Sequence, residues 1–212
     1  MTRIAVIGSG NVGGGLGTRL SNSGFEVKFG VREVDDKVKA LLGRTKGATT
    51  GTPDEAAAWA DVIFIAVPGP VAVEVAKGLA KHLEGKIVVD CNNPLTWKDG
   101  PVWNPPAEGS LAQAIATVAP GARVMKGFNT FGAEFHADPN HAGPAAQVFF
   151  AGDDAEAKKT FAELVTKGGW RPVDSGPLRN AGVLENVGML WIHLALAAGH
   201  GRDWIFLQQK KG

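Results

Sequence analysis

The feature that most constrains this chain of 212 residues is a glycine-rich loop close to its start. The loop, Gly8–Gly13, has glycines at its first, third and sixth positions and follows the apolar run Arg3–Ile7. It leads into Val12–Ser23, where apolar residues have the spacing of an amphipathic helix. Glycines at this spacing allow a tight turn from a strand into a helix that packs closely on it. The loop therefore predicts the first strand–turn–helix unit of an α/β fold.

Downstream, short β-rich runs alternate with helix-length stretches, which is the pattern of a parallel sheet covered by helices on both faces. Most runs are almost wholly apolar, as strands buried on both sides are. Further strands are expected at Glu26–Phe29, Val62–Val67, Lys86–Asp90 and Arg123–Gly127. Helices are expected at Asp54–Ala60, Val71–His82 and Ser110–Val118, with a weaker helical pattern at Val34–Leu42.

A second strand–helix–strand set follows, at Gln147–Ala151, Asp154–Lys167 and Trp170–Asp174. An apolar helix from about Leu178 to Ala198 closes the chain. We therefore expect an α/β protein with a Rossmann-like, doubly wound, mainly parallel sheet, a small C-terminal α/β extension and a long terminal helix. Residues 1–145 are expected to form the main domain, and residues 146–212 a smaller part packed on it. The irregular stretch Cys91–Gly109 has the length of a functional lid or a disordered loop.

The glycine loop also has the features of a dinucleotide site. Its second glycine lets the backbone approach a pyrophosphate, and the unpaired N–H groups and dipole at the helix start favour an anion. The alternative is a plain strand-to-helix turn that uses glycine for geometry alone. We predict that the pyrophosphate-binding residues are Gly8, Ser9, Gly10, Asn11, Val12 and Gly13.

The end of the second strand predicts which dinucleotide binds. An NAD site places an acidic residue there, whereas an NADP site prefers arginine, which binds the 2′-phosphate bidentately. This chain has Arg32 at that position and Lys37 about a turn later, so NADP is favoured. Glu33 would occupy the site if the alignment slipped by a single residue. The alternative for Arg32 is a surface arginine at the sheet edge.

Ligands of open parallel sheets lie beyond the carboxyl ends of the strands. In this chain those ends are followed by Val67 and Pro68, by Asn92 and Asn93, and by Asn129. Prolines force extended backbone before them, and amides offer both a donor and an acceptor. We expect the asparagines to hold the ribose and carboxamide of the nicotinamide, the alternative being ordinary loop residues.

The histidines and the cysteine give weaker signals. His136 and His141 are close to Asp138 in sequence but lack a zinc-binding spacing, so we expect a solvated loop and predict no metal site. His193, inside the apolar helix, is expected to be a core or interface histidine. Cys91 is expected to pack and not to react, because no activating His or Lys adjoins it.

Composition excludes several other classes of function. The 22 Lys and Arg nearly cancel the 21 Asp and Glu, so neither nucleic acid nor an anionic membrane is expected as a partner. The single cysteine suits a reducing compartment, and the apolar runs are too short for a signal peptide or a bilayer span, so we expect a cytoplasmic protein. The absence of tyrosine removes every mechanism that needs a catalytic phenol.

Seven short segments occur in an order that resembles the NADPH:coenzyme F(420) oxidoreductase family, which also covers the cytoplasmic reductase domain of the STEAP metalloreductases. They are Ile7–Gly13, Gly30–Arg32, Ala66–Pro68, Asp90–Leu95, Lys126–Thr130, Gly152–Asp154 and Gly176–Leu178. The resemblance spans nearly the whole chain. It implies an NADP-binding Rossmann domain with a small C-terminal part that helps to bind a flavin or deazaflavin and often mediates dimerisation.

The resemblance also assigns residues by position. It implies that Ser9 to Val12 bind the pyrophosphate, Arg32 the 2′-phosphate, and Val67 with Pro68 the middle of the cofactor. Gly132 falls where the family brings backbone close to the nicotinamide. Two positions depart from the family: Val31 replaces the Ser or Thr that often precedes the arginine, and Asn129 replaces a histidine typical of the deazaflavin reductases.

Together these features predict an NADPH-dependent oxidoreductase that transfers hydride between NADP(H) and a flavin, a deazaflavin or another small redox acceptor. Such acceptors bring their own chemistry, so the protein needs only to position and desolvate them, and we assign no catalytic side chain. Two other families with the same glycine loop fit less well. Short-chain dehydrogenases need a catalytic Tyr, which this chain lacks, and β-hydroxyacid dehydrogenases need a long helical domain, for which this chain has only about one long helix. The alternative from another class is a non-catalytic NADP(H)-binding sensor that acts through protein interaction.

The terminal helix predicts an oligomer. Apolar residues recur at intervals of three and four along it, and a helix that is apolar nearly all round is buried on several sides. The parent domain can cover one side, and the other needs a second subunit or a bound ring system. We therefore expect a homodimer with this helix at the interface; its apolar residues are Val183, Leu184, Val187, Met189, Leu190, Trp191, Ile192, Leu194, Ala195, Leu196 and Ala198.

Overall fold

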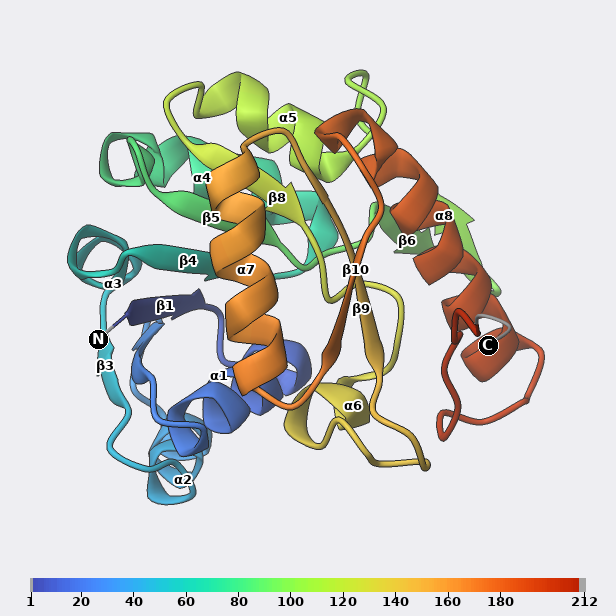
Figure 1. The fold of residues 1–212 in the computed structure, drawn as a ribbon, viewed down its shortest axis with the longest axis horizontal. Coiled ribbons are helices and arrows are strands. Elements are labelled where there is room, and N and C mark those ends of the chain that lie inside the picture. The colour runs from blue at the N-terminus through green and yellow to red at the C-terminus, as the bar shows by residue number, and fades with distance from the viewer. Residues whose placement is uncertain (1, 210–212) are drawn as a thin grey trace.

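A computed structural model describes residues 2–209 and contains one eight-stranded sheet with helices on both faces (Figure 1). The strands of this sheet are β1 (Arg3–Ile7), β2 (Glu26–Gly30), β3 (Thr49–Gly51), β4 (Val62–Ile65), β5 (Ile87–Asp90), β8 (Arg123–Lys126), β9 (Gln147–Gly152) and β10 (Arg171–Asp174). A separate hairpin is formed by β6 (Leu95–Trp97) and β7 (Pro101–Trp103).

The strand order of the large sheet is β10-β9-β8-β5-β4-β1-β2-β3. From β3 to β8 all neighbours are parallel, and the order reverses between β1 and β4, as in a doubly wound Rossmann sheet. β9 then pairs antiparallel with β8, with Lys126 opposite Ala151, and β10 runs parallel to β9. The predicted Rossmann-like, mainly parallel sheet is confirmed, and residues after 145 continue the same sheet.

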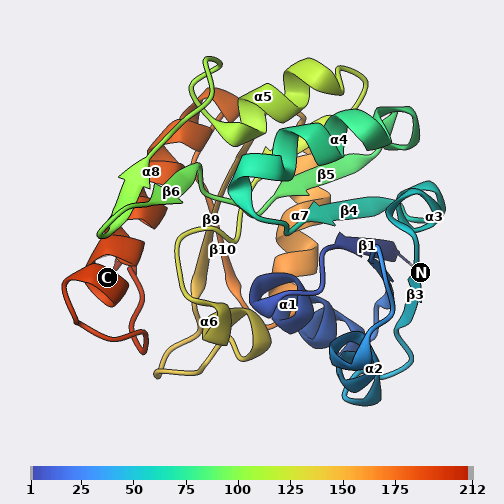
Figure 2. The same ribbon diagram turned by 180° about the vertical axis from the view of Figure 1, so that it is seen from behind.

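The helices are α1 (Asn11–Asn22), α2 (Asp36–Gly43), α3 (Pro53–Trp59), α4 (Gly69–Leu83), α5 (Leu111–Val118), α6 (Ala133–Ala137), α7 (Ala155–Lys167) and α8 (Ala181–Ile192). Side chains of α1, α2 and α7 pack on one face of the sheet, and those of α3, α4 and α5 on the other. Figure 2 shows α4 and α5 side by side on the second face. Among residues 2–209, no helix has both the length and the apolarity to cross a membrane.

Strand alternation explains why two cores form. In β1, Ile4 and Val6 face the core under α1 and α7, whereas Ala5 and Ile7 face the core under α3 to α5. All four side chains are almost fully buried, as expected for a parallel strand covered on both sides.

The terminal helix covers the predicted range but changes type along it: a 3-10 turn, Leu178–Asn180, precedes α8, and a π-helical turn, His193–Ala197, follows it. The structure corrects three other expectations. The stretch Cys91–Gly109 contains the β6–β7 hairpin, and β3 was not predicted. The expectation of a solvated loop is wrong for His136, which is fully buried in α6. Its ring nitrogens lie 2.8 Å from the Phe128 carbonyl oxygen and 3.0 Å from that of Gly132.

Candidate cofactor site

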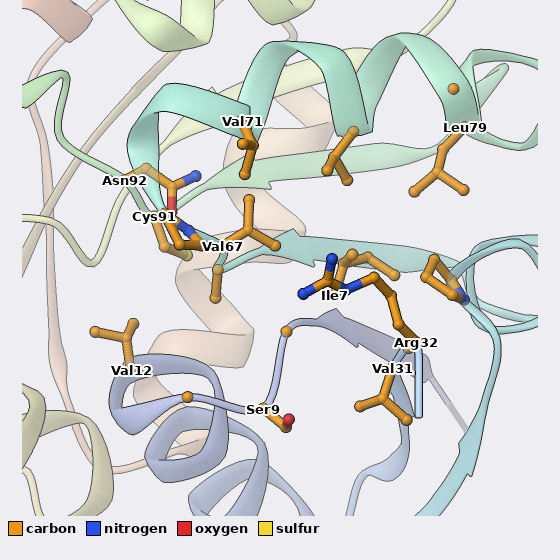
Figure 3. Close-up of a pocket in the computed structure, with 18 of the residues that line it drawn as sticks. Ile7, Ser9, Val12, Val31, Arg32, Val67, Val71, Leu79, Cys91 and Asn92 are labelled. Carbon is orange, nitrogen blue, oxygen red and sulfur yellow. The ribbon is translucent and has the colours of Figure 1, made fainter. Parts of the chain in front are cut away.

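A cavity of about 1180 Å³ lies beyond the carboxyl ends of β2, β1, β4 and β5 (Figure 3). In that spatial order its walls come from Val31 and Arg32, the glycine loop, Ala66–Pro68, and Cys91 with Asn92. α4 covers one side with Val71 and Leu79. Ligand pockets are typically ~300–1,000 Å³, so this one has room for an elongated molecule that spans several strand ends.

Two glycines of the loop are required by the fold itself. Gly8 has φ +109°, and a Cβ on it would lie 2.3 Å from the Ala66 carbonyl oxygen. A Cβ on Gly13 would lie 2.3 Å from the Gly8 carbonyl oxygen, so Gly13 is what lets α1 approach β1.

Gly10 is different, because nothing in the protein requires it. Its φ of −69° suits any residue, and a Cβ there would meet no atom within 4 Å. Gly10 also lines the cavity. We therefore expect the close approach of a ligand, and not packing within the protein, to be the reason for a glycine at this position.

The start of α1 is also the start of an uncapped helix. Gly10 offers no side-chain hydrogen bond, and the first turn holds no acidic residue. The helices α4, α6 and α8 also lack a side-chain cap, whereas α2, α3, α5 and α7 are each capped by a side chain, from Asp35, Thr52, Ser110 and Asp154. Asn11 and Val12, at the start of α1, line the cavity. Their backbone N–H groups and the positive end of the helix dipole both favour an anionic ligand there.

Arg32 extends from the end of β2 into the cavity towards Ile7 (Figure 3). Its guanidinium group forms no ion pair with any of residues 2–209. Glu33 and Asp35 line the same end, but Asp35 is occupied by capping α2 through the backbone N–H of Val38 at 2.9 Å. Lys37 lies on the exposed side of α2 and does not line the cavity.

At the opposite end, Asn92 lines the cavity and is almost fully buried. Its side-chain Nδ2 donates to the Ile65 carbonyl oxygen at 3.0 Å and to Asp90 Oδ1 at 2.8 Å. Both amide hydrogens are thereby used. Asn92 Oδ1 is the atom that remains to accept a hydrogen bond from a ligand.

Asn93 and Asn129 lie outside the cavity lining and bond to each other. Asn93 Nδ2 donates to the Asn129 carbonyl oxygen, and Asn129 Nδ2 to Asn93 Oδ1, both at 2.9 Å. Asn129 Nδ2 also donates to the Leu184 carbonyl oxygen of α8 at 2.9 Å. Gly132 packs against α8 as well, since a Cβ on it would lie 2.7 Å from the Trp191 ring. These residues join two loops to α8.

The structure thus divides the residues that the sequence analysis grouped as one site. The cavity brings together Gly8, Ser9, Gly10, Asn11, Val12, Arg32, Val67, Pro68 and Asn92. Its lining does not include Gly13, Lys37, Asn93, Asn129 or Gly132.

A buried charged cluster beside Asn92 was missed by the sequence analysis. Lys126 Nζ lies 2.7 Å from Asp90 Oδ2 and 2.8 Å from Glu185 Oε1, and all three side chains are fully buried. Burial opposes the charge on Lys126, but the two carboxyl groups outweigh it and raise its pKa. Burial also raises the pKa of Glu185. The signal was present in the sequence, because charged residues within apolar strands and helices are rarely buried without partners.

Cys91 behaves as expected of a packing residue. Its side chain is buried next to Asn92, and burial raises the pKa of its thiol well above the usual value. The thiol is therefore protonated at neutral pH, which makes it a poor nucleophile.

Comparison with known proteins places the chain in a family. A sequence profile described as NADP oxidoreductase, coenzyme F420-dependent, matches residues 3–94. The F420-dependent NADP reductase of Methanothermobacter marburgensis is 30% identical over 214 residues, which cover 91% of this chain and 92% of that protein. Metalloreductase STEAP3 of Rattus norvegicus is 34% identical over 186 residues, or 87% of this chain, but the match spans only 36% of STEAP3.

The fold gives the same assignment. A crystal structure from Arthrobacter sp. FB24, of a protein provisionally assigned as an F420-dependent NADP reductase, superposes with a TM-score of 0.90. It is 30% identical in sequence, and the match covers 99% of this chain and 100% of that one. The chain therefore belongs to the coenzyme F420-dependent NADP oxidoreductase family.

Proposed function

We propose that this protein is an NADPH-dependent oxidoreductase that transfers hydride between NADP(H) and a deazaflavin such as coenzyme F420, or a flavin. The observation that carries the proposal is the pairing of two anion sites in one cavity. One is the uncapped start of α1 beside the open position of Gly10, and the other is the unpaired guanidinium of Arg32. A dinucleotide with a pyrophosphate and a 2′-phosphate has anions to match both sites.

We assign a role to each wall of the cavity. The N–H groups at the start of α1 hold the pyrophosphate, Arg32 holds the 2′-phosphate, and Val67 with Pro68 covers the middle of the cofactor. When bound, NADPH supplies the hydride, and the acceptor brings the ring that receives it. The chain contributes orientation and the exclusion of water, and the walls near the glycine loop, Val67 and Asn92 are lined by glycines, amides and apolar side chains.

We assign the remaining functions to the C-terminal part. Residues 1–145 form the NADP-binding unit, and residues 146–212 bind the acceptor and mediate dimerisation through α8. The supporting observation is the exposed apolar surface of α8, where the side chains of Val183 and Leu190 are 62% and 49% exposed. Trp97 of the adjoining hairpin is 55% exposed. A second copy of the chain would cover these groups, and His193, also exposed, would then be an interface residue.

We place the protein in the cytoplasm, because its single cysteine is a buried free thiol and needs no oxidising compartment.

The test is a turnover assay in which NADPH or NADH is offered with oxidised F420, FMN or a ferric chelate, and reduced F420 is offered with NADP⁺. Turnover of F420 with NADPH and much slower turnover with NADH is the expected result. Tight NADPH binding by calorimetry without turnover of any acceptor would instead support the sensor alternative. No binding of NADPH would refute both.

A further inference from the structure

The buried cluster around Lys126 connects the cofactor cavity to α8. Lys126 Nζ has three hydrogens, and each has an acceptor of its own, two from the end of β5 and the residues after it and one from α8. The acceptors are Asp90 Oδ2 at the end of β5, Glu185 Oε1 on α8, and the main-chain carbonyl oxygen of Asn92. Within the described residues the ammonium group is thus fully satisfied and fully buried.

The charges of the cluster balance if Glu185 is neutral. A single ammonium beside two ionised carboxylates would leave a buried excess negative charge, which is costly without further partners. Glu185 Oε1 accepts from Lys126 and from the Leu111 N–H at 2.9 Å, while Oε2 has no partner among the described residues. A protonated Glu185 leaves the matched pair of Lys126 and Asp90. Glutamine is then a close substitute for Glu185.

The same cluster holds Asn92 in one orientation. Asp90 Oδ1 accepts from the Asn92 backbone N–H at 3.1 Å and from its Nδ2 at 2.8 Å, while Lys126 holds the Asn92 carbonyl oxygen. The amide therefore cannot turn without breaking these bonds. Its Oδ1 is kept free at the cavity wall, where Figure 3 shows Asn92 beside Val67.

The order of the strand ends identifies the part of the ligand that reaches Asn92. Along the sheet, Arg32 follows β2, the glycine loop follows β1, and Asn92 follows β5. The proposed 2′-phosphate site marks the adenosine half, and the pyrophosphate lies in the middle. The nicotinamide half of the dinucleotide then lies at the end of the cavity where Asn92 is.

We propose that Lys126 and Glu185 are positioning residues that make binding of the nicotinamide half depend on the docking of α8. They fix Asn92 so that its Oδ1 accepts a hydrogen bond from a hydroxyl of the nicotinamide ribose. This inference rests on the proposed function as an NADP(H)-binding protein. Because coupling between two sites is reciprocal, dinucleotide binding also strengthens the docking of α8.

The experiment compares two ligands by calorimetry: NADPH, and 2′,5′-ADP, which carries the adenosine half and the 2′-phosphate but no nicotinamide riboside. Glu185→Met removes the acceptor and roughly keeps the side-chain volume. Asn186→Met is the matched control, since Asn186 is exposed and its side chain bonds only to the Gly182 carbonyl oxygen of the same helix. Glu185→Gln is the conservative variant.

For Glu185→Met we expect NADPH affinity to fall about tenfold, within the usual range of coupling between sites, and 2′,5′-ADP affinity to stay within about twofold. Glu185→Gln and Asn186→Met should bind both ligands like the wild type. Equal losses for both ligands, or no loss for either, would overturn the inference while leaving the proposed function intact. Wild-type protein that binds neither ligand would refute the proposed function and this inference with it.

Hydrogen exchange on the unaltered protein gives a second test that does not depend on a folded variant. NADPH should slow amide exchange along α8 several-fold, whereas 2′,5′-ADP at matched saturation should not. Equal protection of α8 by the two ligands, or protection by neither, would contradict a coupling that runs through the nicotinamide end.

Discussion

Gly188 of α8 lies so close to Asn93 that a Cβ on it would be 2.5 Å from Asn93 Oδ1. The same Cβ would be 2.6 Å from the Asn129 carbonyl oxygen, so Gly188 faces the pair of asparagines that joins the loops after β5 and β8. The glycine allows α8 to lie directly on both loops. The position of α8 relative to the cavity is therefore set by main-chain contact as well as by Glu185.

Replacing Gly188 by alanine should destabilise the protein by about 1–3 kcal/mol, because the added methyl group forces α8 and the loops apart. Urea unfolding measures the change. Gly78→Ala is the control: Gly78 lies within α4 and a Cβ there meets nothing within 4 Å. Helix propensity alone should make that variant more stable by up to about 1 kcal/mol. Equal stability of both variants would show that α8 is not in close contact with the loops.

Arg32→Ala should weaken NADPH binding by about 1.5–3 kcal/mol, the range for a charge-assisted hydrogen bond, and leave NADH binding nearly unchanged. Calorimetry with both cofactors measures the difference. Lys37→Ala removes a nearby cation that does not line the cavity and should have little effect on either cofactor. If Arg32→Ala weakens NADPH and NADH equally, Arg32 does not bind the 2′-phosphate.

Gly10→Val should abolish cofactor binding and leave the fold intact, because a Cβ there meets no protein atom within 4 Å and a branched side chain would fill space that the pyrophosphate needs. Gly13→Ala should do the reverse and lower the melting temperature, since its Cβ would be 2.3 Å from the Gly8 carbonyl oxygen. Calorimetry and thermal unfolding separate the two effects. Normal NADPH binding by Gly10→Val would mean that the loop is structural only.

Leu190→Glu should dissociate the proposed dimer, because it places a charge in the middle of the exposed apolar side of α8. Light scattering at micromolar concentration should give twice the chain mass for the wild type and the chain mass for the variant. Val34→Glu is a control at another exposed apolar residue, 47% exposed and away from α8. A wild-type protein with the mass of one chain would refute the dimer.

The stability of the wild type relative to Glu185→Gln should depend on pH. The pKa of Glu185 is raised by burial in the folded protein, so the folded state holds this proton more tightly than the unfolded chain. The stabilisation of the folded state by this proton is fully present below the ordinary glutamate pKa of about 4.3, and it is lost as the pH rises through the folded-state pKa. Unfolding free energies measured from pH 4 upwards should therefore fall for the wild type relative to the variant. A constant difference would contradict a raised pKa.

The parts of the fold that follow from local pattern were predictable. The Gly8–Gly13 turn, the apolar strands and the second strand–helix–strand set gave the element order, and the parallel sheet followed from it. β3 is only three residues long and the β6–β7 hairpin lies among prolines, so neither had a periodic pattern to detect. His136 was misplaced because its burial depends on two carbonyl groups of a loop.

In the candidate site, too, the residues set by local sequence could be predicted, and those set by contacts between distant segments could not. Gly10, Arg32 and Val67 could be placed because each lies at, or within three residues of, the end of a predicted strand. Asn93 and Asn129 also lie just beyond strand ends, but they bond to each other, and Asn129 bonds to Leu184, which lies 55 residues further along the chain. The Lys126–Glu185 pair spans 59 residues. Contacts of this range depend on how α8 crosses the strand ends, which residue spacing does not encode.

The antiparallel pairing of β8 with β9 limits how this molecule can move. Many two-part oxidoreductases close over a substrate by bending at a hinge between their parts. Here such bending would separate Lys126 from Ala151 in the β8–β9 ladder and pull the Phe161 ring away from Phe64 and Phe128. One continuous sheet thus joins residues on either side of position 145. A change in the angle between these parts would cost ladder hydrogen bonds and ring contacts, so we expect any rearrangement that admits a second ligand to be confined to small parts at the rim, such as the β6–β7 hairpin.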